Sequence, residues 1–414
     1  MAMIDFTDWM AEFSGRDTIW YVKRLAANDT LATHAHQAGP YVPRQFLFSL
    51  FPGLDRPGEE NPRVWFDLFI DSHADHRRVS AIWYNNRFRG GTRNEARLTN
   101  FGGQSSALLD PDSTGALTIF AFRQNPDGSA IDCHVWVCRA PPEEDLAEER
   151  MGPVEPGRYL LWSPAYDTRT DLFAHAARPR STCHLAPEEI PTAWLTTFPT
   201  GADIINKTTE LRPDTGLDPD ERLIRRRQCE YELFLSVEEA TELPVIRQGF
   251  DSIEAFVARA QSILQRRKAR SGRSLELHAR NIFLEEGLRE GEHFSHGTES
   301  EPGYRPDFLF PSFECYANPD FPENRLRMLA AKTTCRDRWR QVLDEARRIP
   351  VKHLLTLQEG VSVGQFGQMK EAGIRLVVPA GLVASYPKEV RDELICLESF
   401  IGDVRVLLAG LHGT

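Results

Sequence analysis

An aspartate and a lysine on neighbouring predicted strands constrain this chain more than any other feature. Asp307 follows Pro306, and Lys332 ends the apolar run that includes Leu329. A carboxylate and an ammonium brought together in this way suit hydrolysis of a phosphodiester. The carboxylate holds Mg²⁺, while the ammonium stabilises the phosphorus under attack or orients the attacking water. The pair therefore predicts a metal-dependent nuclease site.

A second carboxylate must complete this site, because divalent metals prefer several oxygen ligands. The acid that commonly stands two residues before such a lysine is absent, since that position is Ala330. A helix capped by Thr334, with an apolar stripe that ends at Ala346, would carry Glu345 towards the metal. Glu276, on an earlier predicted helix, is another candidate. We expect Asp307 and Glu345 to be the metal ligands.

Each of these residues also has a purely structural interpretation. Asp307 could be an ordinary turn residue, and Glu345 and Glu276 could be solvent-facing acids of their helices. Lys332 is harder to dismiss, because a charge at the end of an apolar strand is costly without a partner or a task.

Composition is that of a globular protein with separate cores. The 414 residues are 41% hydrophobic and 26% charged, with a net charge of −11. Such a charge argues against coating nucleic acid indiscriminately but permits a local basic surface. No apolar run reaches membrane-spanning length and no signal peptide is evident, so we expect a cytoplasmic protein without a membrane partner. Seven scattered cysteines predict a reducing compartment without disulfides.

The secondary-structure signals change along the chain and predict a mixed α+β protein of two domains. Residues 1–165 show short aromatic and β-branched strands, a helix after Pro43 and a tight turn at residues 125–128, which suggests a barrel or pseudobarrel. Residues 166–186 lack periodicity and form the predicted linker. Residues 187–414 begin with helices and continue with alternating strands and helices, which predicts a mixed sheet flanked by helices.

Several stretches resemble the EcoRII-type (type IIE) restriction endonucleases, in order and nearly from end to end. In the C-terminal half these are residues 305–312 (Arg-Pro-Asp-Phe-Leu-Phe-Pro-Ser), 331–346, 357–362 and 375–379; in the N-terminal half they are residues 23–30, 92–95 and 110–118. The resemblance implies an N-terminal all-β DNA-binding pseudobarrel of the B3-like kind. It also implies a C-terminal α/β restriction-endonuclease-like core of the PD-(D/E)xK class.

Further expectations come from the resemblance alone. It implies a homodimer that cuts both strands of double-stranded DNA at a short CC(A/T)GG-like site with Mg²⁺, with Tyr316 near the active site. The N-terminal effector domain would bind another copy of the site and, when free of DNA, cover the catalytic cleft and cause autoinhibition. A cognate cytosine methyltransferase is expected in the same restriction-modification system.

Two groups of residues suit DNA reading. Arg336, Asp337 and Arg338 combine arginine forks, which match the O6 and N7 of guanine, with a carboxylate that accepts from cytosine. An exposed salt-bridge cluster is the alternative. In the N-terminal half, the resemblance implies two arms that grip the major groove. Their residues are His36 and Gln37 in one arm, and Arg93, Glu95 and Arg97 in the other.

This chain departs from the family in the second arm, where Gly91 and Ala96 stand at positions that carry lysine in relatives. Effector DNA would then bind more weakly or with altered preference. Two rival functions stay open at this point. One is a repair or junction-resolving nuclease on the same core, which cutting of unmodified plasmid at discrete sites would distinguish. The other is a non-catalytic DNA-binding regulator, which a metal-dependent cleavage assay would exclude.

Overall fold

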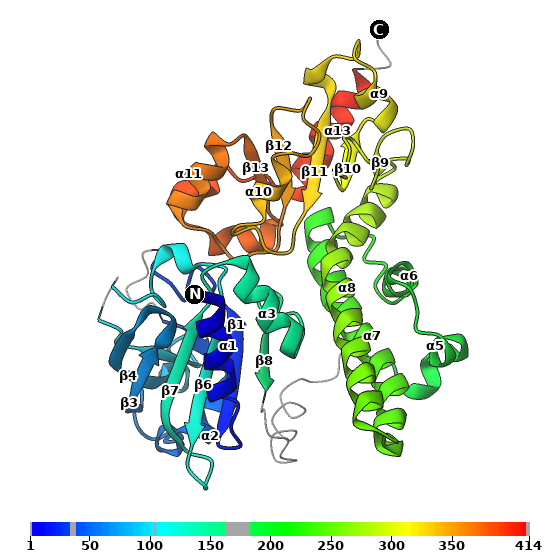
Figure 1. Ribbon diagram of the computed structural model, residues 1–414. Helices are drawn as coiled ribbons and strands as arrows, with labels where there is room; N and C mark the ends of the chain where they lie inside the picture. Colours follow the sequence, from blue (N-terminus) through cyan, green and yellow to red (C-terminus); the bar gives the residue numbers. More distant parts are fainter. Residues whose placement is uncertain (1, 34–38, 103–104, 163–182, 411–414) are drawn as a thin grey trace. The chain divides into compact units, whose positions relative to one another are not determined.

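The computed structural model describes residues 2–33, 39–102, 105–162 and 183–410 (Figure 1). The chain forms two compact units, each treated by itself. The described part of the first unit runs to Trp162 and includes two later segments, Gln358–Phe366 and Ala384–Arg391. The second unit contains the rest of the C-terminal half. Among the described helices, none is long and apolar enough to cross a membrane.

The first unit is built on an eight-stranded sheet with the order β2-β5-β4-β3-β7-β6-β1-β8. Every pair of neighbours is antiparallel except β3 and β7, which run parallel. The strands are β1 Thr18–Arg24, β2 Tyr41–Val42, β3 Arg63–Ile70, β4 Asp75–Tyr84, β5 Glu95–Thr99, β6 Leu117–Gln124, β7 Ala130–Val137 and β8 Tyr159–Trp162. The predicted turn joins β6 to β7, where the N–H of Gly128 donates to the carbonyl of Asn125 at 2.9 Å.

Side-chain alternation along β1 separates two cores. Ile19 and Tyr21 face an inner core that helix α2 (Arg44–Leu50) fills. Trp20 and Val22 face an outer core that α1 (Ala2–Glu12) and α3 (Pro141–Met151) cover. The hydroxyl of Tyr21 donates to the carbonyl of Tyr41 on β2 at 2.8 Å, so the curled sheet brings its two ends together. This arrangement confirms the pseudobarrel, although sequence patterns did not predict α1 or α3.

The two late segments of the first unit pack closely on its N-terminal residues. The N–H of Ala27 donates to the carbonyl of Glu359 at 2.8 Å. Ser362 Oγ donates to Asp112 Oδ1 at 2.6 Å, and Gln365 Nε2 donates to the Asp112 carbonyl at 3.1 Å. At Gly360, whose φ is +103°, a Cβ would lie 2.4 Å from the Cβ of Ala27, so only glycine fits there. We refer to this set of contacts as the seam.

The second unit contains a five-stranded mixed sheet with the order β13-β12-β11-β10-β9. Strands β9 to β11 pair antiparallel, and β11 to β13 pair parallel. The strands are β9 Ser295–His296, β10 Phe308–Phe310, β11 Arg327–Ala331, β12 Lys352–Leu355 and β13 Ile374–Val377. The helices of the C-terminal half are α5 Thr192–Thr196, α6 Gly201–Leu211, α7 Pro219–Gln248, α8 Ile253–Glu285, α9 Phe313–Ala317, α10 Trp339–Val342, α11 Val363–Glu371, α12 Lys388–Arg391 and α13 Leu397–Ala409.

One end of helix α8 packs against the sheet, and the helix also packs against α7 (Figure 1). Near its end, Phe283 packs against Phe308 and Phe310 of β10, with ring centroids 5.1 and 5.6 Å apart. Ser252 caps the helix by accepting from the N–H of Ala255 at 3.1 Å. The apolar residues at the start of α8 are not buried, and Ile253 is 77% exposed.

Two other expectations are wrong. The helix predicted after Lys332 shrinks to the four residues of α10, and Ala346 adopts a left-handed φ of +46°. Glu301 explains the early end, because its carboxylate accepts from the N–H groups of Ala346 and Arg347. The second concerns disulfides. Cys183 and Cys229 are joined by one, because the segment before α5 lies against α7.

Candidate active site

Antiparallel pairing of β10 with β11 brings Asp307 and Lys332 together, as the sequence predicted. Phe308 lies opposite Leu329, so the start of β10 faces the end of β11. Asp307 Oδ2 accepts from the N–H of Ala331 at 2.7 Å and from Lys332 Nζ at 3.2 Å. Both bonds use the same oxygen, which leaves Oδ1 for a ligand.

Burial raises the pKa of Asp307 above its ordinary value. The charge of Lys332 and the N–H of Ala331 lower it in part, whereas the negative charge of Glu276 raises it further. Asp307 is thus a carboxylate whose ionised form still lacks full compensation. A cation placed beside it would supply that compensation.

Glu345 joins this pair even though the predicted helix ends at Val342, before it reaches Glu345. It is 9% exposed, and its buried Oε2 has no hydrogen-bond partner among the described residues. Burial raises the pKa of Glu345 to about 7; the nearby charge of Asp307 adds to this, and that of Lys332 opposes it. A buried carboxylate oxygen without a donor is expensive to maintain, and such an atom fits the coordination of a metal ion.

Glu301 positions this segment, and no sequence signal pointed to it. Its carboxylate accepts from the N–H of Ala346 at 3.1 Å and of Arg347 at 3.0 Å. Its other partners are the hydroxyls of Ser300 and Tyr316. These bonds hold the turn after α10 and thereby set where Glu345 lies.

Tyr316 is engaged with Glu301, and not with Asp307 or Lys332. Burial and the bond to Glu301 raise the pKa of the Tyr316 phenol to about 12. The N–H of Arg348 donates to the same hydroxyl at 3.4 Å. A direct role for Tyr316 in the chemistry stays a prediction; its contacts support the turn that carries Glu345.

Glu276 lies close enough to Asp307 for its charge to affect that carboxyl. Its Oε1 is 2.6 Å from His296 Nε2. Four charged candidates from separate parts of the chain, namely Asp307, Lys332, Glu345 and Glu276, therefore share one neighbourhood.

The residues present fit a divalent ion that keeps part of its own hydration. In the residues that the structure describes, no three side chains of His, Cys, Asp or Glu make a metal cluster. Mg²⁺ does not need one, because it typically binds through one or two carboxylates, waters and substrate phosphates. Asp307 and Glu345 supply two carboxylates, and the unsatisfied oxygen of Glu345 is the atom that most requires a cation.

The segment between Lys332 and α10 carries the predicted base-reading residues. Asp337 is held by Arg340 at 3.1 Å and lies 3.8 Å from Arg336 Nε. The partly exposed side chain of Arg338 makes no ion pair or hydrogen bond with any residue that the structure describes. Arg338 is therefore free to donate to a ligand, whereas Arg336 and Asp337 already have protein partners.

In the first unit, residues of the predicted effector arm make contacts within the protein itself. Arg97 on β5 donates to the carbonyl of Gly39 at 2.8 Å and lies 3.3 Å from Glu95. The guanidinium of Arg93 lies over the ring of Tyr84 at 5.4 Å. Ala96 is fully buried in the inner core. Gly91 is exposed, and His36 and Gln37 lie outside the described residues.

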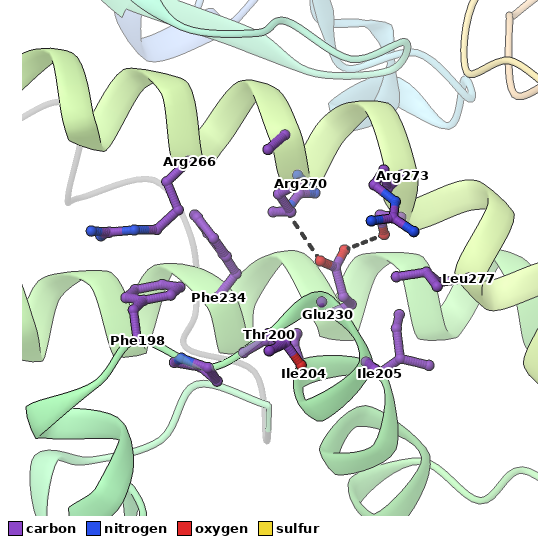
Figure 2. A pocket seen from close by; sticks show the side chains of 15 residues that line it. Phe198, Thr200, Ile204, Ile205, Glu230, Phe234, Arg266, Arg270, Arg273 and Leu277 are labelled. Atoms are coloured by element: carbon purple, nitrogen blue, oxygen red, sulfur yellow. Dashed lines mark hydrogen bonds and ion pairs between the residues drawn. The ribbon is translucent and has the colours of Figure 1, made fainter. Parts of the chain in front are cut away.

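A cavity of about 370 Å³ lies elsewhere, between α6, α7 and α8 (Figure 2). The buried Glu230 in its wall is 3.1 Å from Arg270 Nε and accepts from Ser274 Oγ at 3.0 Å. None of the candidate catalytic residues lines it. These charges are already paired and brace the two long helices.

Comparison with known proteins places both halves in one family. A family model described as "Restriction endonuclease EcoRII, N-terminal" matches residues 14–165, and one described as "EcoRII C terminal" matches residues 234–401. A type II restriction enzyme, EcoRII of Escherichia coli, is 43% identical over 99% of this chain and 100% of its own length.

Solved structures show more partial likeness. Metal-depleted Ecl18kI in complex with uncleaved, modified DNA covers 55% of this chain and 86% of that one, at 20% identity and a TM-score of 0.45. The B3 domain of the UbaLAI restriction endonuclease with cognate DNA covers 39% of this chain and 98% of that one, at 23% identity and a TM-score of 0.27.

The raised pKa of Glu345 predicts a pH-dependent stability. Below the pKa of an exposed glutamate, about 4.3, the group is protonated in both states and costs nothing. As pH rises towards 7, ionisation favours the unfolded chain, so stability is lost. In metal-free protein, Glu345→Gln should therefore raise the free energy of unfolding by about 1–3 kcal/mol at pH 8, with a smaller gain at pH 5.

Thermal melting in a chelator at both pH values measures this difference. The exposed Glu371→Gln is the matched control and should change stability far less. Equal melting temperatures for wild type and Glu345→Gln at pH 8 would contradict a strained, buried carboxylate.

Proposed function

Because this chain belongs to the EcoRII family of type II restriction enzymes, we propose that it makes Mg²⁺-dependent double-strand cuts at a short CC(A/T)GG-like site. The observation that carries the proposal is the Asp307–Lys332 pair with the unsatisfied carboxylate of Glu345 beside it. Two carboxylates and one ammonium in a partly buried site suit hydrolysis of a phosphodiester.

Each residue has a distinct task in this proposal. Asp307 and Glu345 hold the divalent ion, which when bound activates water and neutralises charge on the phosphate. Lys332 is kept beside Asp307 by their 3.2 Å contact and donates to the attacked phosphate or orients the water. Glu276 adds a negative charge that reinforces cation binding at Asp307.

Base recognition falls to the segment before α10. Arg338 has no protein partner among the described residues and can donate a bidentate pair to guanine, while Asp337 can accept from cytosine. A homodimer would let each subunit read one half of a nearly palindromic site. We further propose that the protein acts in the cytoplasm, alongside a cytosine methyltransferase that protects the host's own sites.

The N-terminal domain is the proposed effector domain and inhibitor. The seam supports this, because Gln358–Phe366 follows β12 of the catalytic core directly in the chain yet packs with the first unit. Effector DNA would favour the released state only through its higher affinity for it. Gly91 is exposed and stands in place of a basic residue, so this activation should be weak or salt-sensitive; the buried Ala96 does not face a ligand.

The catalytic roles predict a separation of cleavage from binding. Asp307→Ala or Lys332→Ala should lower the cleavage rate on the order of a thousandfold or more, because several kcal/mol of transition-state stabilisation are lost. Binding to the specific site should stay largely intact, since these groups act on phosphate and metal. Digestion of unmethylated DNA with Mg²⁺ and sequencing of the ends measures both the rate and the site. The exposed Asp320→Ala serves as control, and near-normal cleavage by either mutant would refute the assignment.

Base reading predicts a loss of discrimination at one base pair. Arg338→Ala should weaken binding to the specific site by about 1–3 kcal/mol and relax the preference for a G·C pair. Binding to duplexes substituted at single positions measures this. The exposed Arg347→Ala, a few residues on, is the matched control. An equal loss for every sequence would mean that Arg338 contacts phosphate.

If the seam contributes to autoinhibition, a single substitution in it should weaken that inhibition. Asp112→Ala removes the carboxylate that Ser362 contacts, and a hydrogen bond to a charged group contributes about 1.5–3 kcal/mol. Cleavage of a plasmid with one site should become faster, on the order of tenfold. The control is Asp127→Ala, an exposed residue of the β6–β7 turn. An unchanged single-site rate would remove this contact from the inhibitory mechanism while leaving the nuclease assignment in place.

A further inference from the structure

We propose that His296 is a positioning residue that fixes Glu276 beside the reacting centre, an inference that rests on the proposed nuclease function. His296 belongs to β9, a strand of two residues at the edge of the catalytic sheet. Its Nε2 lies 2.6 Å from Glu276 Oε1, so His296 is a hydrogen-bond partner of that carboxylate.

The backbone places His296 next to the catalytic strand. Residue His296 pairs with Phe308, which directly follows Asp307. The imidazole also stacks on the Phe308 ring, with centroids 5.1 Å apart and planes inclined by 25°. In addition, the N–H of Gly297 donates to the carbonyl of Asp307 at 3.0 Å. The ring therefore has a fixed location relative to Asp307.

A second carboxylate, that of Glu290, lies on the other side of the ring, beyond hydrogen-bond distance. His296 Nδ1 lies 3.9 Å from Glu290 Oε1, and Glu290 is bound in turn by Arg280 Nε at 2.8 Å. Arg280 stands one turn after Glu276 on α8. Arg280, Glu290, His296 and Glu276 therefore form a row of neighbouring side chains. The first and last members of this row lie on the same face of α8.

The chemistry of the two groups fixes the direction of the hydrogen bond between His296 and Glu276. An ionised carboxylate can only accept, so Nε2 must carry the proton that points at Glu276. The side chains of His296 and Glu276 are each only 14% exposed, and a bond to a charged group is strong in such surroundings. Without His296, the long side chain of Glu276 would sample several rotamers, and its charge would no longer act from one position.

This arrangement is that of an outer-shell partner of a metal site, where a histidine orients a carboxylate. Glu276 influences Asp307 through its charge, so its location matters for the affinity of the site for cations. The cost of losing such an outer-shell partner is commonly 10- to 100-fold in metal affinity or activity.

The first experiment compares three variants of the full-length protein in Mg²⁺ titrations of cleavage. His296→Ala should lower the rate at limiting Mg²⁺ by about 10- to 100-fold and raise the Mg²⁺ concentration for half-maximal rate. His296→Gln, which keeps an N–H donor, should recover much of this loss. His293→Ala removes a neighbouring histidine that bonds to Arg289 and should behave as wild type.

The second experiment needs no catalysis. Nitrogen-15 NMR of ring-labelled histidines in metal-free protein should show one Nε2-protonated imidazole that is missing from His296→Gln. That resonance should shift in Glu276→Gln and stay in place in His293→Ala. A purely structural role would change melting temperature and metal-free DNA binding instead, and we expect both to be unchanged in His296→Gln.

Three results would overturn the proposal. The first is wild-type Mg²⁺ dependence of cleavage in His296→Ala. The second is a cleavage rate in His296→Gln no higher than in His296→Ala. The third is an NMR resonance of His296 that does not shift in Glu276→Gln. Asp307→Ala separates this failure from failure of the proposed function. If Asp307→Ala is inactive while His296→Ala is normal, only the positioning role is lost.

Discussion

The antiparallel ladder between β10 and β11 is the constraint on which the rest of the site depends. It sets Phe308 opposite Leu329, and this register makes the Ala331 N–H and the Lys332 ammonium converge on one oxygen of Asp307. A slip of one residue would turn these side chains to the opposite face of the sheet. The aromatic packing of Phe283 against Phe308 and Phe310 holds that register from the core side.

Around this ladder the fold keeps charged groups in places that are costly. Asp307 and Glu345 both have raised pKa values because burial disfavours their ionised forms. The structure compensates only in part, through Lys332 for both carboxylates, the N–H of Ala331 for Asp307 and the charge of Lys352 for Glu345. Such incomplete compensation is typical of a site prepared for a cation and a phosphate, where stability is exchanged for function. Elsewhere, the buried Glu230 of α7 has partners on α8, namely Arg270 and Ser274.

Residues outside the reacting groups position them. The carboxylate of Glu301 accepts from two backbone N–H groups and from Tyr316, and these bonds end α10 early and set where Glu345 lies. His296 does for Glu276 what Glu301 does for Glu345. A comparably close contact occurs in the first unit, where the approach of Gly360 to Ala27 leaves no room for a larger side chain.

The sequence by itself determined the strand pair around Asp307 and Lys332, the curled sheet of the first unit and the tight turn between β6 and β7. These features depend on alternation, turn residues and spacing, which are local properties of the chain. It could not determine that Glu345 leaves the helix, that Tyr316 bonds to Glu301, that His296 reaches Glu276, or that Cys183 meets Cys229. Only the tertiary structure decided these, because each partner is distant in sequence and no local pattern records which side chain will fill a given position in the fold.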